Sequence, residues 1–274
     1  MKNHTQETGI EQVQVCVTDQ VEQYTQYAGT LALADVWRWM GVPQVFARAG
    51  IRYGTQDDRA PEFGFVLTTG PLLRATSIRR IAQRFGGEPS KESLEADELL
   101  RCLVSKSPKQ RQLSRFVNTE RYEWKEFHHQ RVRQLQCIPM FAPHRKGVII
   151  VDDFPLPKPY AKEMTYLTSI WDNNLKRSVP GYAVVHLYYH HPHRPGYSLY
   201  AEPWLKTSMD GSTTPKPKEA RRRAKPGEER SKLDIALDAL EAFLPEVESY
   251  EAVVFDSWYT ARWFCCALTH QDVP

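Results

Sequence analysis

The fold is decided by two short stretches, VIIVDD at residues 148–153 and AVVFD at residues 252–256. Each is a continuous apolar run of the kind that forms a strand buried on both faces of a sheet. Between them the sequence predicts a helix, opened by a capping box of Ser231 and Asp234 and closed by Pro245. A helix that crosses over between two strands lays them parallel, so we expect these two strands to lie side by side in one direction.

Two further strands are expected between the first strand and this helix. They are the alternating, aromatic-rich segments GYAVVHLYY at residues 181–189 and YSLYAE at residues 197–202. Residues 190–196 contain Pro and Gly and are predicted to form a hairpin loop. The region from residue 147 onward therefore reads as a mixed α/β sheet.

The first 140 residues are predicted to be mostly helical, with stop signals such as Gly41 and Gly86 separating the helices. The expected helices are residues 31–40, 45–51, 71–85, 90–104 and 120–136. We thus expect a helical region over residues 1–140 and a sheet-containing core over residues 147–274.

Composition excludes several classes of protein. With 41% hydrophobic and 25% charged residues, the chain of 274 residues has enough apolar side chains for a packed core. Its apolar runs are far shorter than the about 20 residues that cross a bilayer, and the N-terminus has no apolar stretch typical of a signal peptide. Its 5 cysteines are scattered, which argues against a disulfide framework. We therefore expect a cytoplasmic protein without a membrane partner.

The small net charge of +3 hides two basic blocks. Residues 71–146 carry 16 basic and 8 acidic side chains, and residues 204–232 carry 9 basic and 4 acidic ones. Clustered Lys and Arg are typical of proteins that bind nucleic acid, although a solvated helical surface has the same composition. Residues 206–232 lack apolar periodicity and are predicted to form a basic loop.

Both buried strands end in carboxylates, Asp152 and Asp153 on the first and Asp256 on the second. The carboxyl ends of parallel strands meet at one edge, where open α/β sheets bind their ligands. Convergent carboxylates suit Mg²⁺ or Mn²⁺, which can activate a water or hydroxyl for phosphodiester chemistry. Acids at strand ends are also common as simple solvated caps.

The ordered set of motifs resembles the DDE transposases of bacterial insertion sequences. The set comprises VIIVDDFPLPKPY (148–160), WDNNLKRSVPGYAVVHL (171–187), YAEPWL (200–205) and YEAVVFDSWYTARWF (250–264), preceded by LSRFVNTERYEWKEFHHQRVRQL (113–135). The resemblance covers residues 110–265 and implies a ribonuclease-H-like catalytic core that cuts DNA at element ends and joins it to target DNA. It also implies a nucleoid-associated bacterial protein, with a homodimer or a full-length transposase as further partners.

The resemblance implies that Asp153 and Asp256 are catalytic metal ligands for Mg²⁺ or Mn²⁺, with Asp152 as the alternative to Asp153. We prefer Asp153 because the family's first acid commonly follows another acidic residue. Successive strand residues point to opposite faces, so only one of the pair faces the metal directly.

Several basic residues are candidates for DNA contacts. Lys158 follows the first acid by five residues, and Lys176 and Arg177 follow WDN at residues 171–173, whose residue types equally favour a plain turn. A second group lies in the basic loop and would contact phosphates or serve as a generic linker; it comprises Arg221, Arg222, Arg223 and Lys225.

The family's third ligand, a glutamate on a later helix, has no counterpart, because no glutamate follows position 251 and Asp272 is the only acid after Asp256. We therefore expect a catalytic core lacking its C-terminal part and a truncated transposase. The alternatives are a non-catalytic DNA-binding protein that modulates a full-length transposase, and a ribonuclease-H-like nuclease unrelated to transposition.

Two smaller motifs have structural explanations. The three histidines of the hairpin, His190, His191 and His193, could bind a transition metal but are more typical of an exposed loop. Cys265 and Cys266 have no histidine beside them in sequence and are expected to pack in the core.

Overall fold

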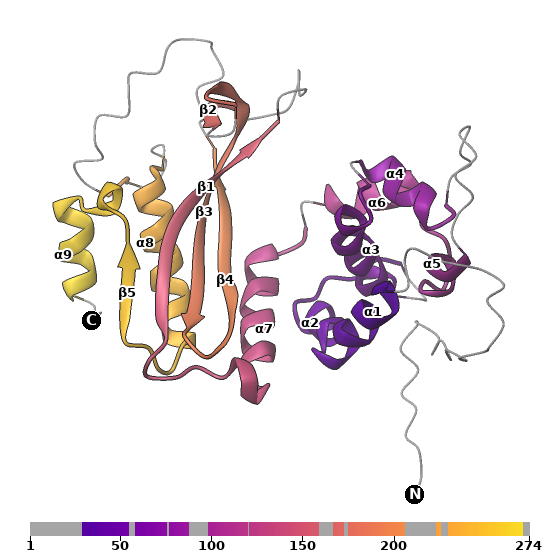
Figure 1. Ribbon diagram of the computed structural model, residues 1–274, viewed down its shortest axis with the longest axis horizontal. Helices are drawn as coiled ribbons and strands as arrows, with labels where there is room; N and C mark the ends of the chain where they lie inside the picture. The colour runs from indigo at the N-terminus through magenta and orange to yellow at the C-terminus, as the bar shows by residue number, and fades with distance from the viewer. Residues whose placement is uncertain are drawn as a thin grey trace, which may run out of the picture. The chain divides into compact units, whose positions relative to one another are not determined.

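The computed structural model describes residues 29–54, 58–75, 77–87, 98–119, 121–158, 167–172, 175–205, 223–225 and 230–270. The chain divides into two compact units, a helical unit (Met1–Gln134) and a sheet unit (Leu135–Pro274), as Figure 1 shows. Within the parts that are described, no helix is both long and apolar enough to span a membrane.

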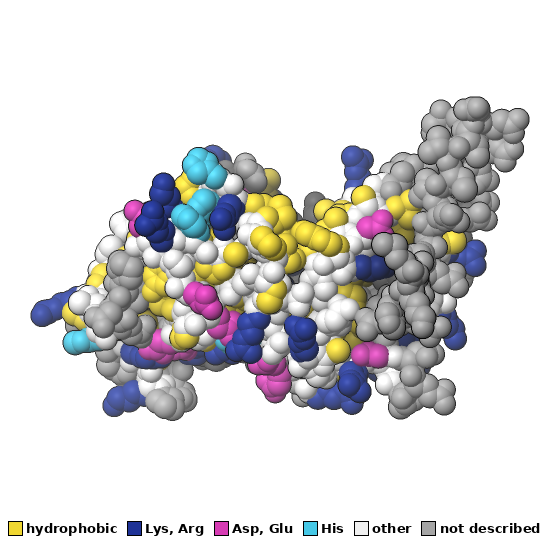
Figure 2. All heavy atoms as spheres, turned by 90° about the horizontal axis from the view of Figure 1, so that it is seen from below, with side chains coloured by type: hydrophobic (Ala, Val, Ile, Leu, Met, Phe, Trp, Pro, Cys, Tyr) yellow, Lys and Arg dark blue, Asp and Glu magenta, His cyan; other side chains and the backbone are white. Residues whose placement is uncertain are grey.

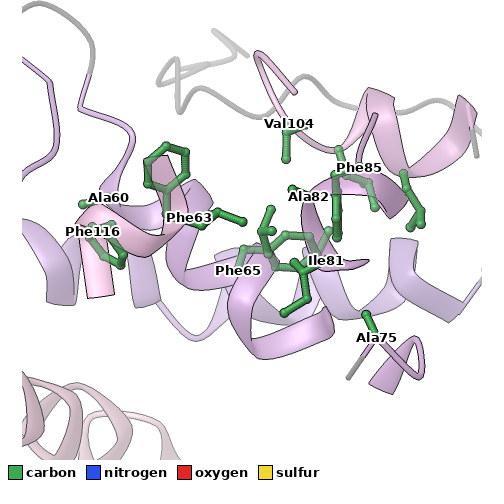
Figure 3. Close-up of a cluster of buried hydrophobic side chains, with 14 of the residues drawn as sticks. Ala60, Phe63, Phe65, Ala75, Ile81, Ala82, Phe85, Val104 and Phe116 are labelled. Carbon is green, nitrogen blue, oxygen red and sulfur yellow. The ribbon is translucent and has the colours of Figure 1, made fainter. Parts of the chain in front are cut away.

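The helical unit is built from short helices around an aromatic core. The helices are α1 (Gly29–Trp39), α2 (Val42–Arg48), α3 (Ala60–Leu72), α4 (Ile78–Arg84), α5 (Glu98–Cys102), α6 (Gln110–Val117) and α7 (Trp124–Gln136), the last of which runs into the sheet unit. Phe63, Phe65, Phe85 and Phe116 are almost completely buried, and Figure 3 shows them together with Ile81.

The helix predicted over residues 71–85 is wrong as a single element. Pro71 lies in the last turn of α3, and Arg74 takes a left-handed conformation with φ 57°, which breaks the helix. A new helix then starts at α4, where the Ser77 hydroxyl accepts a hydrogen bond from the Arg80 N–H at 3.2 Å. The preceding helix α3 was missed because it is mostly apolar and buried on most sides, so it has no amphipathic stripe.

Among its described residues, the sheet unit has five strands. They are β1 (Val148–Pro157), β2 (Thr168–Asp172), β3 (Arg177–His191), β4 (Arg194–Trp204) and β5 (Ala252–Phe255). The order is β2-β3-β1-β5, with β4 also paired to β3. β1 is antiparallel to β3 and parallel to β5, which confirms the predicted crossover. This mixed α/β arrangement is the predicted ribonuclease-H-like type.

Helix α8 (Lys232–Phe243) makes the crossover and packs on β3 and β4 (Figure 1). Ser231 and Asp234 form the predicted capping box at its start. After it come the short 3-10 helix η2 (Leu244–Glu246), β5, a further 3-10 helix η3 (Ser257–Tyr259) and α9 (Arg262–His270). The 3-10 helix η1 (Pro139–Phe141) precedes the sheet.

Three details of the sheet differ from the sequence prediction. Strand β1 runs on to Pro157 instead of ending at the aspartates, because β3 pairs with it along its whole length. The hairpin loop predicted over residues 190–196 is a tight turn at Pro192 and His193, since the strands continue to its edges. Strand β2 was not predicted, and it pairs with the first residues of β3.

Candidate active site

The register of β1 and β5 brings the predicted acids to one edge of the sheet. Val148 to Val151 pair with Ala252 to Phe255, and the aspartates follow directly on both strands. Neighbouring strands lie about 4.8 Å apart, so Asp256 lies next to the Asp152–Asp153 pair. Asp256 also caps the start of η3, where its Oδ1 accepts a hydrogen bond from the backbone N–H of Trp258 at 2.9 Å.

The two aspartates of β1 lie on opposite faces of the sheet. Asp153 shares its face with the buried Ile149 and Val151, because residues two apart in a strand point the same way, and its side chain is 24% exposed. Asp152 lies on the other face, is exposed, and accepts a hydrogen bond from the Asp153 N–H at 2.7 Å. Asp153 is therefore the acid that faces the packed side of the sheet.

Asp153 is held by two residues from distant parts of the chain. The Lys232 ammonium, on the first residue of α8, lies 2.5 Å from Asp153 Oδ2. The hydroxyl of Tyr259 donates to Asp153 Oδ1 across a longer distance of 3.5 Å. Both partners reach the site because α8 starts and η3 lies at the same edge of the sheet as the aspartates.

Tyr259 reports the negative charge at this edge. Its side chain is fully buried, and burial raises the pKa of its hydroxyl, with further increases from the charges of Asp153, Asp152 and Asp256, in that order. The phenol therefore stays protonated at neutral pH and acts as a hydrogen-bond donor. All three carboxylates are close enough to this hydroxyl to act on its ionisation.

The donor types fit a hard divalent cation. Asp153 and Asp256 offer carboxylate oxygens, which Mg²⁺ and Mn²⁺ prefer. Among the residues that the structure describes, no group of three or more His, Cys, Asp or Glu side chains is arranged to hold a metal ion. In the part of the chain that the structure describes, the carboxylates at this edge are those of Asp152, Asp153 and Asp256, and Asp272 lies outside the described residues.

Three of the predicted DNA contacts lie at one end of the sheet, beyond the aspartates. The backbone N–H of Lys158, just after β1, donates to the Pro180 carbonyl in β3 at 2.7 Å. Lys176 is exposed in the turn between β2 and β3, and Arg177 is exposed as the first residue of β3. In the same turn, Asp172 Oδ1 accepts a hydrogen bond from the Leu175 N–H at 3.0 Å. This side chain therefore stabilises the turn, as its residue type predicts.

The predicted DNA contacts of the basic loop have different environments. Arg223 is held in ion pairs with Asp238 at 2.5 Å and Glu241 at 2.7 Å, both on α8, so its guanidinium binds this helix. Lys225 is exposed, whereas Arg221, Arg222 and most of the loop 206–232 lie outside the described residues.

The histidines of the β3–β4 turn form a hydrogen-bonded structural cluster. The buried His191 accepts the His193 N–H at Nδ1 (3.1 Å), so its Nε2 carries the proton and faces Nδ1 of His144 at 3.3 Å. Figure 2 shows histidine side chains beside Lys and Arg side chains on one face of the molecule. Both ring nitrogens of His191 are used in these hydrogen bonds. The hydrogen bonds therefore account for the position of its imidazole, and no metal ion is needed to explain it.

Cys265 and Cys266 lie in α9 as free thiols. Cys265 is partly buried and Cys266 is exposed, so the expected core packing is wrong for Cys266. The buried residues of α9 are Phe264 and Leu268 instead.

A comparison with protein families identifies the kind of enzyme to which this edge belongs. The family model described as DDE superfamily endonuclease matches residues 97–273, which is more than half of the chain. The chain belongs to the DDE superfamily endonucleases. No curated protein matches it at a significant level.

Membership of the DDE family confirms the resemblance to DDE transposases and the ribonuclease-H-like fold. It makes the chain a nuclease-type enzyme with DNA as its substrate, of a family that usually uses divalent metal ions. The origin in a bacterial insertion sequence and the assignment of individual site residues stay predictions.

Sequence reasoning missed Lys232 and Tyr259, which contact Asp153. It also missed Trp204 and Trp258, whose rings lie near the Lys232 ammonium. One signal pointed to Lys232: the capping box makes it the first residue of the crossover helix. A crossover helix runs antiparallel to the strands that it joins, so its N-terminus must lie at their carboxyl edge, beside the aspartates.

Proposed function

We propose that this DDE endonuclease is a transposase that cleaves DNA at element ends and joins it to target DNA. The observation that carries the proposal is the β1–β5 register, which brings Asp256 level with Asp152 and next to Asp153 at the carboxyl edge of a ribonuclease-H-like sheet. Its family membership supplies the substrate class and the reaction class.

In this proposal Asp153 and Asp256 hold the divalent ion. When bound, Mg²⁺ or Mn²⁺ supplies Lewis-acid activation of a water or 3′-hydroxyl and stabilises the leaving oxygen. The protein orients Asp153 through its face of the sheet and through the hydroxyl of Tyr259. The Asp256 carboxylate is oriented by the Trp258 N–H, which fixes one of its oxygens at the start of η3.

The DNA is proposed to run from this edge along the exposed end of the sheet. Lys158, Lys176 and Arg177 would contact phosphates there, which fixes the position of the strand without reading its sequence. The ion pairs of Arg223 with α8 give that residue an anchoring role, so we expect its loss to affect the position of residues 223–225 more than DNA affinity.

A second candidate function is a DNA-binding protein without catalytic activity, which would modulate a complete transposase. Two observations favour it. The oxygen Oδ2 of Asp153 is already occupied by the Lys232 ammonium, and the described residues offer no group of three metal ligands. Such a protein would bind element ends with the same basic residues and would not cut them.

The test uses the full chain and a supercoiled plasmid that carries its own coding region with the flanking DNA. The proposal expects nicking and joining that require Mn²⁺ or Mg²⁺ and stop with EDTA. Asp256→Asn should lower the rate by at least about 100-fold, because the loss of a metal ligand removes several kcal/mol of transition-state stabilisation. The matched control is Glu251→Gln, an exposed carboxylate just before the opposite end of β5.

The outcomes separate the candidates. Cleavage that survives Asp256→Asn but not EDTA would overturn the assignment of the site. Binding of the plasmid without any cleavage supports the second candidate function. Preference for an RNA–DNA hybrid over duplex DNA would indicate a ribonuclease-H-like nuclease unrelated to transposition.

A further inference from the structure

A lysine side chain occupies the position beside Asp153 where a metal ion would bind. The Lys232 ammonium lies 2.5 Å from Asp153 Oδ2, and the two side chains are only 16% and 24% exposed. An ion pair at this depth is screened by water much less than one at the surface. The Asp153 carboxylate therefore has a cation of its own, contributed from 79 residues further along the chain.

Two tryptophans enclose this ammonium group. The Lys232 Nζ lies 5.6 Å from the ring centre of Trp204, at the end of β4, and 5.1 Å from that of Trp258, in η3. A cation within about 6 Å of an aromatic ring face is attracted by the ring's electrons. Lys232 is thus stabilised by three neighbours in its position at the active-site edge.

The enclosure is anchored to the acids and to α8. The indole N–H of Trp204 donates to the Arg230 carbonyl at 2.9 Å, two residues before Lys232. The Trp258 N–H donates to Asp256, the second predicted metal ligand. The capping box of Ser231 and Asp234 fixes the first turn of α8, and with it the backbone of Lys232.

We propose that Lys232 is a built-in competitor of the divalent ion, which must displace the ammonium from Asp153 in order to bind there. This inference rests on the proposed function, because it takes Asp153 as a metal ligand. A divalent ion bound at Asp153 Oδ2 and the Lys232 ammonium would repel each other at short range, so the free energy of the Lys232–Asp153 pair is subtracted from that of metal binding. Competition by the Lys232 ammonium would thus weaken metal binding at this site, in addition to the effect of its small number of carboxylates.

The test measures Mn²⁺ affinity without DNA, by the electron paramagnetic resonance signal of free Mn²⁺. Lys232→Met keeps the length and the apolar stem between the tryptophans but removes the charge. We expect it to bind Mn²⁺ about three- to tenfold more tightly than the unchanged chain, the range of a partly buried ion pair. Lys232→Arg keeps the charge and should stay weak. The matched control is Lys146→Met, an exposed lysine at the other end of β1.

The added variant Asp153→Asn in the Lys232→Met background separates the two proposals. If the unchanged chain binds Mn²⁺ through Asp153 and Lys232→Met leaves the affinity the same or lower, the competition is wrong and the metal site stands. If none of the variants binds Mn²⁺, or if binding does not depend on Asp153, the metal site itself is wrong and the competition with it. Tightening that Asp153→Asn abolishes supports both. Thermal melting of each variant shows that it is folded.

Discussion

The start of α8 depends on one buried carboxylate, Asp234, which is 3% exposed. Its Oδ2 accepts the Ser231 N–H at 2.8 Å and the Ser231 hydroxyl at 2.6 Å, and its Oδ1 accepts the Ala224 N–H at 2.8 Å. Asp234 therefore caps the helix and also attaches residues 223–225 to it. We predict that Asp234→Ala lowers the free energy of unfolding of the sheet unit substantially.

The magnitude follows from the three donors that lose their acceptor. Each buried donor left without a partner costs about 1–3 kcal/mol, and two of these three are backbone groups that cannot turn away. Because water will reach some of them, we expect about 3 kcal/mol for Asp234→Ala, taken from the lower part of that range.

The matched control is Asp238→Ala, one turn later on the same helix. Asp238 is 36% exposed and pairs with Arg223 and Arg230 at the surface, so its loss should cost less than about 1 kcal/mol. Urea unfolding gives the free energies, and hydrogen exchange of the α8 peptide shows where the loss occurs. Equal effects of Asp234→Ala and Asp238→Ala, or a cost of Asp234→Ala below about 1 kcal/mol, would contradict the reasoning.

Three other changes test the packing and the histidine cluster. In the helical unit, Gly64→Ala would place a Cβ on the ring of Phe46 and should cost about 1–3 kcal/mol by urea unfolding; an unchanged midpoint would contradict this packing. Leu237→Ala, at a fully buried position of α8, should cost about 2–5 kcal/mol in the same assay, and a cost near zero would mean that α8 does not cover the sheet. Burial, followed by the charges of neighbours led by His144, lowers the pKa of His191 below its ordinary value of about 6.5, so the folded state resists protonation. The contribution of His191 to the free energy of unfolding should therefore be full above pH about 6.5 and be lost as the pH drops through the lowered pKa. His191→Gln should reduce the difference in the free energy of unfolding between pH 8 and pH 5.5. An equal difference in the variant and the unchanged chain would refute this role of His191.

The sequence predicted the sheet where local pattern and topology agree. The run 148–151, the run 252–255 and the capped helix between them each have a strong local signal, and the crossover rule then fixes their direction. The same reasoning predicted that Asp153 and Asp256 lie at one edge of the sheet. The preference for Asp153 over Asp152 came from the family's pattern of a preceding acidic residue, whereas the alternation of strand faces showed only that one of the two can face a metal ion directly. The choice between them stays a prediction.

The other features of the fold depend on contacts between segments far apart in the sequence, which a local sequence pattern does not reveal. β1 continues past the aspartates because β3 pairs with it up to Pro157, and β2 exists because β3 extends back to Arg177. The helix α3 lacks an amphipathic stripe because it is buried on most sides, so periodicity could not reveal it. Lys232 was read as one more residue of a basic loop, although its place on the helix N-terminus brings it to Asp153.

The most direct test of the central claim asks whether Asp153 and Asp256 hold one ion. Fe²⁺ replaces Mg²⁺ in such sites, and with ascorbate and peroxide it generates hydroxyl radicals that cut the polypeptide close to the ion. We predict cuts near residues 152–153 and near residue 256, which Mg²⁺ suppresses and which both Asp153→Asn and Asp256→Asn abolish. Cuts confined to one strand, or cuts that persist in both variants, would contradict the account.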